Sequence, residues 1–487
     1  MTISLEPLVA GAVEHIRRVV SLDRVMCSEG YDGALAYVAE NLRCPREWMH
    51  WDVYPPAESF WGWRVPPNLP HWRDGRADRR IAIPNDRPMK ALQVRVPGTT
   101  DAEIVFVTHA CHPAPGANDN ASGLAMLMEL IRYYTLHPPR FSLRFLFTVE
   151  YWGTVAFCAR HEAELSGMIA GVSVDMVGAD QDLCGSTMVV DEIPDHLASC
   201  LDLAFWHHMQ IAARVGHYRL IGNPLTAFRC NFAYHMGGSD HYVLNDSSVA
   251  IPSTALGTDP DRFYHTPDDT IDKISPDTLR LFFTTIVEGL ETFSDVSERG
   301  HHRLAQLVLH RYDEVIHALM VDAVGPGDVG ADEAAFRIAH TYRHAAARLA
   351  SLTKTHSAGT IKPWLELLDD CFAQTRRTFA VCRGRTLEVP ELTDTVRYRK
   401  RFKGPLSLDR MRERLSVAER AFVAKHAADD RLFFQKVDAA LNYASQRSLA
   451  ETAWLLRLHY GGVSYTETLR SFFEILCGHE LLEVVRV

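Results

Sequence analysis

The sequence has no apolar stretch of about 18 residues, which excludes a conventional membrane-spanning helix. It also lacks the basic start, compact apolar run and small-residue cleavage site of a secretory leader at its amino terminus. Positive charge is in the minority, because 51 Lys and Arg stand against 61 Asp and Glu, and the formal net charge is −10. An acidic chain repels polyanions, so we expect a cytoplasmic protein that binds neither membranes nor nucleic acid.

Disulfide chemistry is also excluded, because none of the ten cysteines forms a CxxC pair and their spacing shows no disulfide framework. Several lie in apolar segments, so we predict reduced thiols that pack as small hydrophobic side chains. Cys111 stands apart, since it lies between His109 and His112. The remaining composition is that of an ordinary globular protein, and 487 residues suffice for two or three domains.

Short apolar runs rich in β-branched and aromatic residues alternate with helical patterns in the first part of the chain. The runs are 102–110, 141–150, 168–177 and 247–256, and an amphipathic helix is predicted over 275–293. This alternation predicts the α/β class, a three-layer sandwich with a mixed, mostly parallel sheet. We assign residues 1–300 to this domain, and functional groups should gather where its strands end.

Two further modules are predicted. Apolar residues recur at helical spacing in three stretches after residue 300, so we expect a helical bundle over 301–395 that acts as a lid or a homo-oligomer contact. Residues 396–487 predict a winged-helix-like module, with capping boxes at Ser448 and Ser464 and a final strand. The basic stretch 397–403 reads best as a solvated linker ahead of it.

Five side chains that can bind a metal follow the predicted strands or open the next helix. They are His109, Asp119, Glu150, Asp175 and His265. A single histidine or a single carboxylate at a strand end is usually structural. An ionised group after an apolar run needs a partner, however, and imidazole and carboxylate are common zinc ligands. The five together therefore predict a metal centre.

The motifs around these residues resemble those of the zinc exopeptidases. HxxxxxxxxxDNASG, Glu150, VDMVG, GGSDHYVL, IPSTAL and YHTPDDT follow in that superfamily's order over roughly residues 80–295. The superfamily includes leucyl aminopeptidases, glutamate carboxypeptidase and glutaminyl cyclase. The likeness is closer to an aminopeptidase-like branch that has an HxCHP motif, here HACHP, an aromatic segment, here SFWGWRVPP, and a C-terminal winged helix.

The resemblance implies a role for each matching residue. His109 and Asp175 would bind one metal ion, Asp119 would bridge to a second, and His265 would bind that second ion. Glu150 would be the general base that takes a proton from the attacking water. Asp240 and His241 would support the site or the substrate. The implied reaction is zinc-dependent cleavage of an amide bond in a small aminoacyl or peptide-like substrate.

One position departs from the pattern. The di-zinc enzymes have a second glutamate directly after the base, and this chain has Tyr151 there. Tyrosine is a poor zinc ligand, so we expect one strong zinc site and a second that is weak or absent. His112 could replace the missing ligand or could serve only as a hydrogen-bonding group in its turn.

The substrate is less well defined by the sequence. The segment 228–240 is the predicted specificity loop, with Arg229, Tyr234 and His235 facing the substrate. Two alternatives to hydrolysis stay open. One is a single-zinc acyltransferase or cyclase-like enzyme on the same fold. The other is a non-catalytic regulatory or binding protein that uses the C-terminal module, although its predicted recognition helix carries few basic residues.

Overall fold

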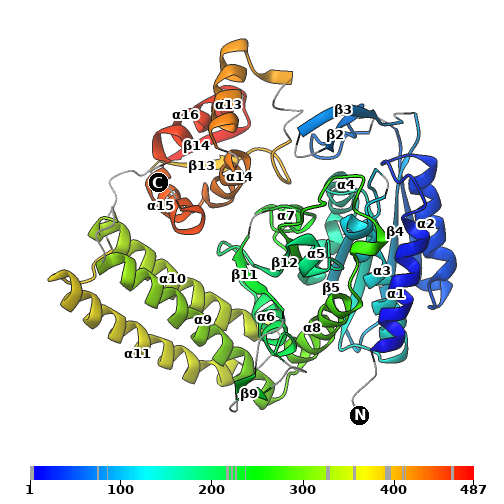
Figure 1. Ribbon diagram of the computed structural model, residues 1–487. Helices are drawn as coiled ribbons and strands as arrows, with labels where there is room; N and C mark the ends of the chain where they lie inside the picture. Colours follow the sequence, from blue (N-terminus) through cyan, green and yellow to red (C-terminus); the bar gives the residue numbers. More distant parts are fainter. Residues whose placement is uncertain are drawn as a thin grey trace. The chain divides into compact units, whose positions relative to one another are not determined.

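The computed structural model describes residues 5–486, except for 57, 74–75, 85, 114, 215–218, 221–222, 225–227, 236, 325–328, 355–357, 390–395, 408–410, 412, 431 and 462–464. The chain divides into two compact units (Figure 1). Unit 1 comprises Met1–Pro194 and Leu201–Ser294, and unit 2 comprises Asp195–Cys200 and Asp295–Val487. The division into three domains at residues 300 and 395 stays a prediction.

An eight-stranded sheet forms the centre of unit 1. Its order is β1 (Met49–Tyr54), β4 (Met89–Val96), β6 (Phe141–Thr148), β5 (Thr100–His109), β7 (Met168–Val174), β12 (Ser253–Asp259), β8 (Thr187–Glu192) and β11 (Cys230–Tyr234). Strands β6, β5, β7 and β12 run parallel, whereas β4 and β8 run antiparallel to their neighbours in this group. The predicted mixed, mostly parallel α/β sheet is confirmed.

The order of the strands explains why helices cover both faces of the sheet. The chain passes from β5 to its neighbour β6 through α3 (Gly123–Leu136), and from β6 back across β5 to β7 through α4 (Trp152–Arg160). These two crossovers lead in opposite directions, so right-handed connections place α3 and α4 on opposite faces. Helices α6 (Leu201–Ala212) and α8 (Pro276–Ser294) pack with each other, and α8 also contacts α3. Helix α4 packs instead with α7 (His241–Leu244).

The predicted strands at 102–110, 141–150 and 168–177 correspond to β5, β6 and β7. The strand predicted over 247–256 is wrong at its start, because β12 begins only at Ser253. Its first residues belong to a turn around Asp246, whose backbone carbonyl accepts from Val249 and Ala250. Ala250 also has a positive φ of 57°, which a strand does not allow.

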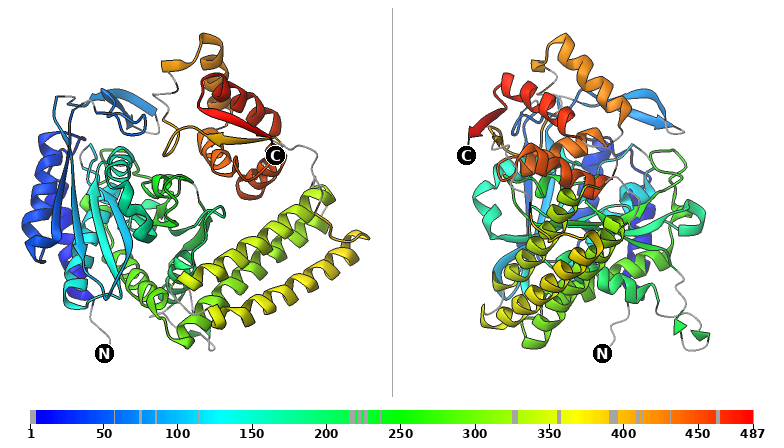
Figure 2. Two further views of the ribbon diagram at one scale, coloured as in Figure 1. Left: turned by 180° about the vertical axis from the view of Figure 1, so that it is seen from behind. Right: turned by 90° about the vertical axis from the view of Figure 1, so that its left-hand side faces the viewer.

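Unit 2 begins with the three helices that the spacing of apolar residues predicted. They are α9 (Glu298–Val324), α10 (Ala331–Ser351) and α11 (Ala358–Arg383), seen side by side in both views of Figure 2. Helix α10 contacts both α9 and α11 along their lengths, so the apolar stripes bury one another. Among the described residues, no helix is both long enough and apolar enough to cross a membrane.

The last part of unit 2 has its own apolar core. Helices α13 (Val417–Asp429), α14 (Phe433–Tyr443), α15 (Leu449–Tyr460) and α16 (Thr466–Gly478) accompany a two-stranded antiparallel sheet of β13 (Val396–Lys400) and β14 (Leu482–Arg486). The capping box at Ser448 is confirmed, whereas Ser464 lies outside the described residues. The basic stretch is not a linker, because β13 pairs with β14, Tyr398 is buried and Arg399 bonds Glu483. The winged-helix assignment stays a prediction.

Candidate metal centre

The carboxyl ends of the parallel strands bring the predicted metal ligands together at one edge of the sheet. His109 is the last residue of β5, Glu150 closely follows β6, and Asp175 directly follows β7. The register places His109 opposite Thr148, so these ends lie level with each other. His265 reaches the same place from the loop that follows β12, because its imidazole contacts Asp119.

Asp119 lies at the centre of the group. Its Oδ1 is 3.4 Å from Nε2 of His109, and its Oδ2 is 3.4 Å from Nε2 of His112 and 3.2 Å from Nε2 of His265. Asp175 completes the first side of the group, with Oδ1 3.3 Å from the same nitrogen of His109. Each oxygen of Asp119 therefore faces a different set of imidazoles, as a bridging carboxylate would.

These separations are those of atoms that share a zinc ion. Two ligands at 2.0–2.2 Å from a tetrahedral zinc lie roughly 3.3–3.5 Å apart, which is longer than an ordinary hydrogen bond. The structure brings two groups of potential ligands within 4.8 Å of one another, His109 with Glu150 and Asp175, and His112 with Asp119 and His265. With Asp119 facing both groups, His109, Asp119 and Asp175 fit one zinc ion, and His112, Asp119 and His265 fit a second.

The orientation of two imidazoles supports this interpretation. Nδ1 of His109 lies 2.9 Å from the backbone oxygen of Cys111, and Nδ1 of His112 lies 2.5 Å from that of Pro113. A carbonyl oxygen only accepts, so each Nδ1 is the donor and Nε2 of the neutral ring carries the lone pair. That lone pair faces carboxylate oxygens, an arrangement that is favourable only with a proton or a metal ion between them.

The charges at the site are strongly coupled. Burial opposes the charged form of every group, yet Asp175 and Glu150 raise the pKa of His109 well above its usual value. Despite the same burial, His112 and His265 hold the pKa of Asp119 well below its usual value. For Glu150, burial together with the nearby Asp175 raises the pKa well above that of an ordinary carboxyl. A carboxyl that takes up a proton readily at neutral pH suits a general base.

Asp119 is held in place through the turn that carries it. Asp269, which is 1% exposed, accepts from the backbone amides of Asn118 at 2.8 Å and Asp119 at 3.0 Å. The side chain of Asn120 donates to Thr108 at 3.0 Å and to the carbonyl of Val174 at 3.1 Å, which ties the turn to β5 and β7. The NDNAS sequence thus provides the central carboxylate of the group and the side chain that ties its turn to the sheet.

Arg24 is a positioning residue that the sequence analysis missed. It is 1% exposed, and its guanidinium donates to the carbonyls of Val19, Ala110, Pro115 and Gly116 at 3.0–3.1 Å. Its own carbonyl accepts from the amide of His112 at 2.9 Å. Burial lowers the pKa of Arg24 to about 10, so the group stays charged at neutral pH. No local pattern around Arg24 signals this role, because its partners lie far along the chain.

Tyr151 has hydrogen-bond partners outside the group of predicted metal ligands. Its amide donates to Asp240 at 2.8 Å, and its hydroxyl donates to the carbonyl of Gly237 at 3.4 Å. Asp240, which is fully buried, also accepts from Thr154 at 2.6 Å and so caps the start of α4. Both residues therefore support the segment that carries Glu150.

The other predicted site residues have structural partners. His241 pairs with Asp191 of β8 at 3.1 Å, and His235 packs against the ring of His241. The guanidinium of Arg229 bonds the carbonyls of Gln181 and Ser186 and the carboxylate of Asp182. Part of the predicted specificity loop is strand β11, which runs parallel to β8 and therefore opposite to the catalytic strands. Its end at Tyr234 leads away from the edge where the metal ligands gather.

Comparisons with known proteins give distant similarities. Residues 13–192 match the model of a family described as a domain of unknown function, DUF4910. A stretch of 81 residues is 32% identical to a Clostridium acetobutylicum protein described as a polysaccharide biosynthesis protein with an aminopeptidase-like domain. That stretch is 17% of this chain and only 18% of the relative.

Among solved structures, a glutaminyl cyclase from an Acidobacteriales bacterium is 22% identical, with a TM-score of 0.42 over 58% of this chain and 94% of that one. A structure described as a peptidase from Clostridium acetobutylicum is 12% identical, with a TM-score of 0.46 over 99% of both chains. A zinc-dependent exopeptidase from Parabacteroides distasonis is 16% identical, with a TM-score of 0.40 over 58% and 97%. These include the groups that the motifs resemble.

Proposed function

We propose that this protein is a zinc-dependent hydrolase that cleaves an amide bond in a small aminoacyl or peptide-like substrate. The observation that carries the proposal is the orientation of the imidazoles of His109 and His112. His109 and His112 each donate from Nδ1 to a carbonyl and present Nε2 to carboxylate oxygens at 3.3–3.4 Å. This geometry suits a cation held between nitrogen and oxygen ligands.

Two sets of three ligands support binding of two zinc ions. His109, Asp119 and Asp175 make the first set, and His112, Asp119 and His265 make the second. Three protein ligands with an open position are the usual composition of a catalytic zinc site. We therefore propose that His112 serves as the ligand that the di-zinc enzymes supply as a glutamate at the position of Tyr151. The second zinc site would then have three protein ligands, and it would not be weak or absent. When bound, zinc would lower the pKa of its water towards 7 and polarise the amide carbonyl.

Glu150 is the proposed general base. Its carboxyl belongs to the group with His109 and Asp175, and burial raises its pKa. One carboxylate oxygen would accept the proton of the attacking water, and the same carboxyl would then deliver it to the nitrogen of the leaving amine. Asp240 holds the amide of Tyr151 and so fixes the backbone that positions Glu150.

The test is hydrolysis of a panel of aminoacyl amides by the zinc-loaded protein, with the products identified by mass spectrometry. We expect free amino acid and amine, and Glu150→Gln should lower kcat by about 10²–10⁴-fold while zinc content is unchanged. Glu47→Gln, at an exposed glutamate, is the matched control. A cyclic or transferred product would point to the acyl-transfer alternative. A fully active Glu150→Gln protein would refute the role of the base.

A further inference from the structure

Helix α11 of unit 2 has one face that packs into the bundle and one face that is exposed. On the inner face, the hydroxyl oxygens of Thr375 and Tyr312 of α9 lie 3.2 Å apart, and the hydroxyl of Tyr342 of α10 donates to Asp369 at 2.5 Å. The buried residues of α11 are Ile361, Leu368, Thr375 and Phe379. These contacts fix the rotation of α11 about its axis, and so they determine which residues face outwards.

The outward face carries a stripe of seven exposed residues, which we call the α11 stripe. They are Pro363, Leu367, Asp370, Gln374, Arg377, Thr378 and Val381. At about 100° per residue, all seven lie within about 60° of Gln374 around the helix axis. Leu367 is 45% exposed and Val381 is 85% exposed, so the stripe presents a large apolar side chain near each of its ends.

The apolar side chains of the stripe are placed symmetrically about Gln374. Leu367 comes seven residues before Gln374 and Val381 seven residues after it, which is about 10.5 Å along the helix axis in either direction. If two copies of α11 run antiparallel and meet at Gln374, then Leu367 of each copy lies opposite Val381 of the other. One exposed valine needs no explanation, whereas this spacing lets both apolar side chains be covered at once.

The charges of the stripe fit the same arrangement. Asp370 lies four residues before Gln374 and Arg377 three residues after it, both displaced to the same side of the line through Gln374. In the antiparallel pair, Asp370 of one copy is therefore level with Arg377 of the other to within about 1.5 Å, and this ion pair forms twice. A parallel pair would instead place Asp370 opposite Asp370. The guanidinium of Arg377 already lies beside the centre of the stripe, because it donates to Oε1 of Gln374 at 2.7 and 3.1 Å.

We propose that the α11 stripe binds a second copy of this chain and forms a symmetric dimer in which the two α11 helices run antiparallel. A two-fold contact between identical patches is the commonest way in which identical chains associate. Contacts between Leu367 and Val381 would form its apolar part, and the pairs of Asp370 with Arg377 would determine its direction. One pair of helices gives an interface at the small end of the usual range, so we expect a dissociation constant of about micromolar size. The dimer does not depend on the proposed hydrolysis.

Sedimentation velocity of the full chain over about 1–100 µM tests whether the dimer forms. We expect a monomer–dimer equilibrium that Val381→Lys weakens by at least about tenfold, because the new charge would lose hydration against Leu367. Val417→Lys makes the same change at a valine that is 76% exposed in α13, and it should leave the dissociation constant unchanged. A monomer at every concentration, or a dimer that Val381→Lys does not weaken, would overturn the proposal.

Reversal of single charges tests the antiparallel direction. Asp370→Arg and Arg377→Glu each place two pairs of like charges opposite each other, so each should weaken the dimer by about tenfold. Arg376→Glu is the matched control, since it changes the net charge equally at an exposed residue outside the stripe. An equimolar mixture of the Asp370→Arg and Arg377→Glu proteins should associate as tightly as the unmodified protein, because each chain then supplies the charge that the other needs. Equal weakening by Arg376→Glu, or a mixture that stays monomeric, would overturn the antiparallel contact.

Discussion

Replacement of His112 by alanine is the sharpest test of the metal centre. The change removes one of three ligands from the second set and leaves only Asp119 and His265, whereas the first set keeps His109, Asp119 and Asp175. A structural zinc site with four ligands binds with about 10–16 kcal/mol, so an even division gives about 2.5–4 kcal/mol per ligand. At 1.4 kcal/mol per tenfold, zinc affinity of the second site should fall by about two to three orders of magnitude.

Equilibrium dialysis against buffered zinc, followed by elemental analysis, measures both sites separately. The free zinc concentration is set so that it just saturates the unmodified protein. We then expect about two zinc ions per chain in the unmodified protein and about one in His112→Ala. His265→Ala should behave like His112→Ala. His50→Ala removes a histidine whose side chain is 66% exposed, and it should change nothing. If His112→Ala keeps both ions with unchanged affinity while His265→Ala loses one, then His112 is a hydrogen-bonding residue and the second ligand set is wrong.

Two further predictions concern buried charges that hold each unit together. Arg24→Met leaves four backbone carbonyls without their donor. At about 1–3 kcal/mol for each buried unsatisfied group, the free energy of unfolding in urea should fall by at least about 4 kcal/mol, with a loss of zinc content. A stable, zinc-replete variant would contradict its positioning role. In unit 2, Asp195 accepts from His340 and His459, and despite burial these two histidines hold the pKa of Asp195 well below its usual value. A depressed pKa stabilises the fold above the unfolded value of about 3.9, and that contribution is lost as the pH falls through the folded value. The difference in melting temperature between the unmodified protein and Asp195→Asn should therefore shrink as the pH is lowered from 6 towards 3, and a constant difference would contradict the ion pairs.

Much of the metal centre follows from the sequence because each ligand sits next to a strong local pattern. His109, Glu150 and Asp175 end or follow largely buried strands of seven to ten residues, and parallel neighbours must bring such ends to one edge. His265 lies in a loop, and only its resemblance to a known motif placed it in the site. The strands β8 and β11 were not predicted, because they are short and carry polar residues such as Asp191 and Asn231 within the run.

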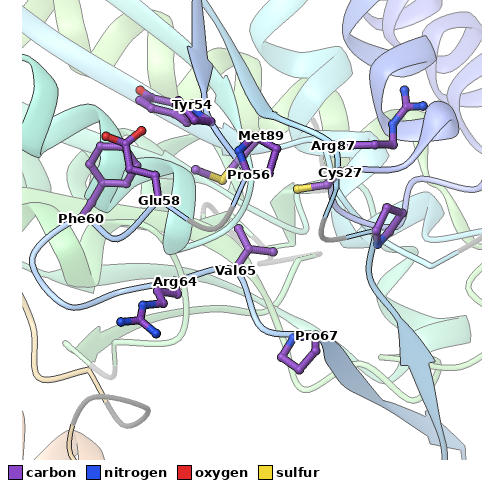
Figure 3. Close-up of a pocket in the computed structure, with 12 residues that line it drawn as sticks. Cys27, Tyr54, Pro56, Glu58, Phe60, Arg64, Val65, Pro67, Arg87 and Met89 are labelled. Carbon is purple, nitrogen blue, oxygen red and sulfur yellow. The ribbon is translucent and has the colours of Figure 1, made fainter.

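The features that sequence could not supply are those that depend on contacts between distant segments. The role of His112 depends on the direction of its Nε2, which the carbonyl of Pro113 and the buried Arg24 determine together. The pocket of about 160 Å³ in unit 1 (Figure 3) requires Cys27, Val65 and Met89 to meet, although each lies in a different local pattern. Likewise, the partners of Arg229 in residues 181–186 lie far from it along the chain, so its local sequence does not show them.

Distance separates the proposed metal centre from the group of Asp195, His340 and His459 in unit 2. Nε2 of His340 lies 2.5 Å and Nε2 of His459 lies 2.8 Å from the same oxygen of Asp195, so each nitrogen must donate a proton to it. At the strand ends the corresponding separations are 3.2–3.4 Å. There, for His109 and His112, the protonated nitrogen of the ring is already committed to a carbonyl. The first arrangement is complete as a set of hydrogen bonds, whereas the second needs a proton or a metal ion between nitrogen and oxygen. The same residue types therefore form ion pairs in unit 2 and the proposed metal centre in unit 1, and the separation of nitrogen and oxygen differs between the two.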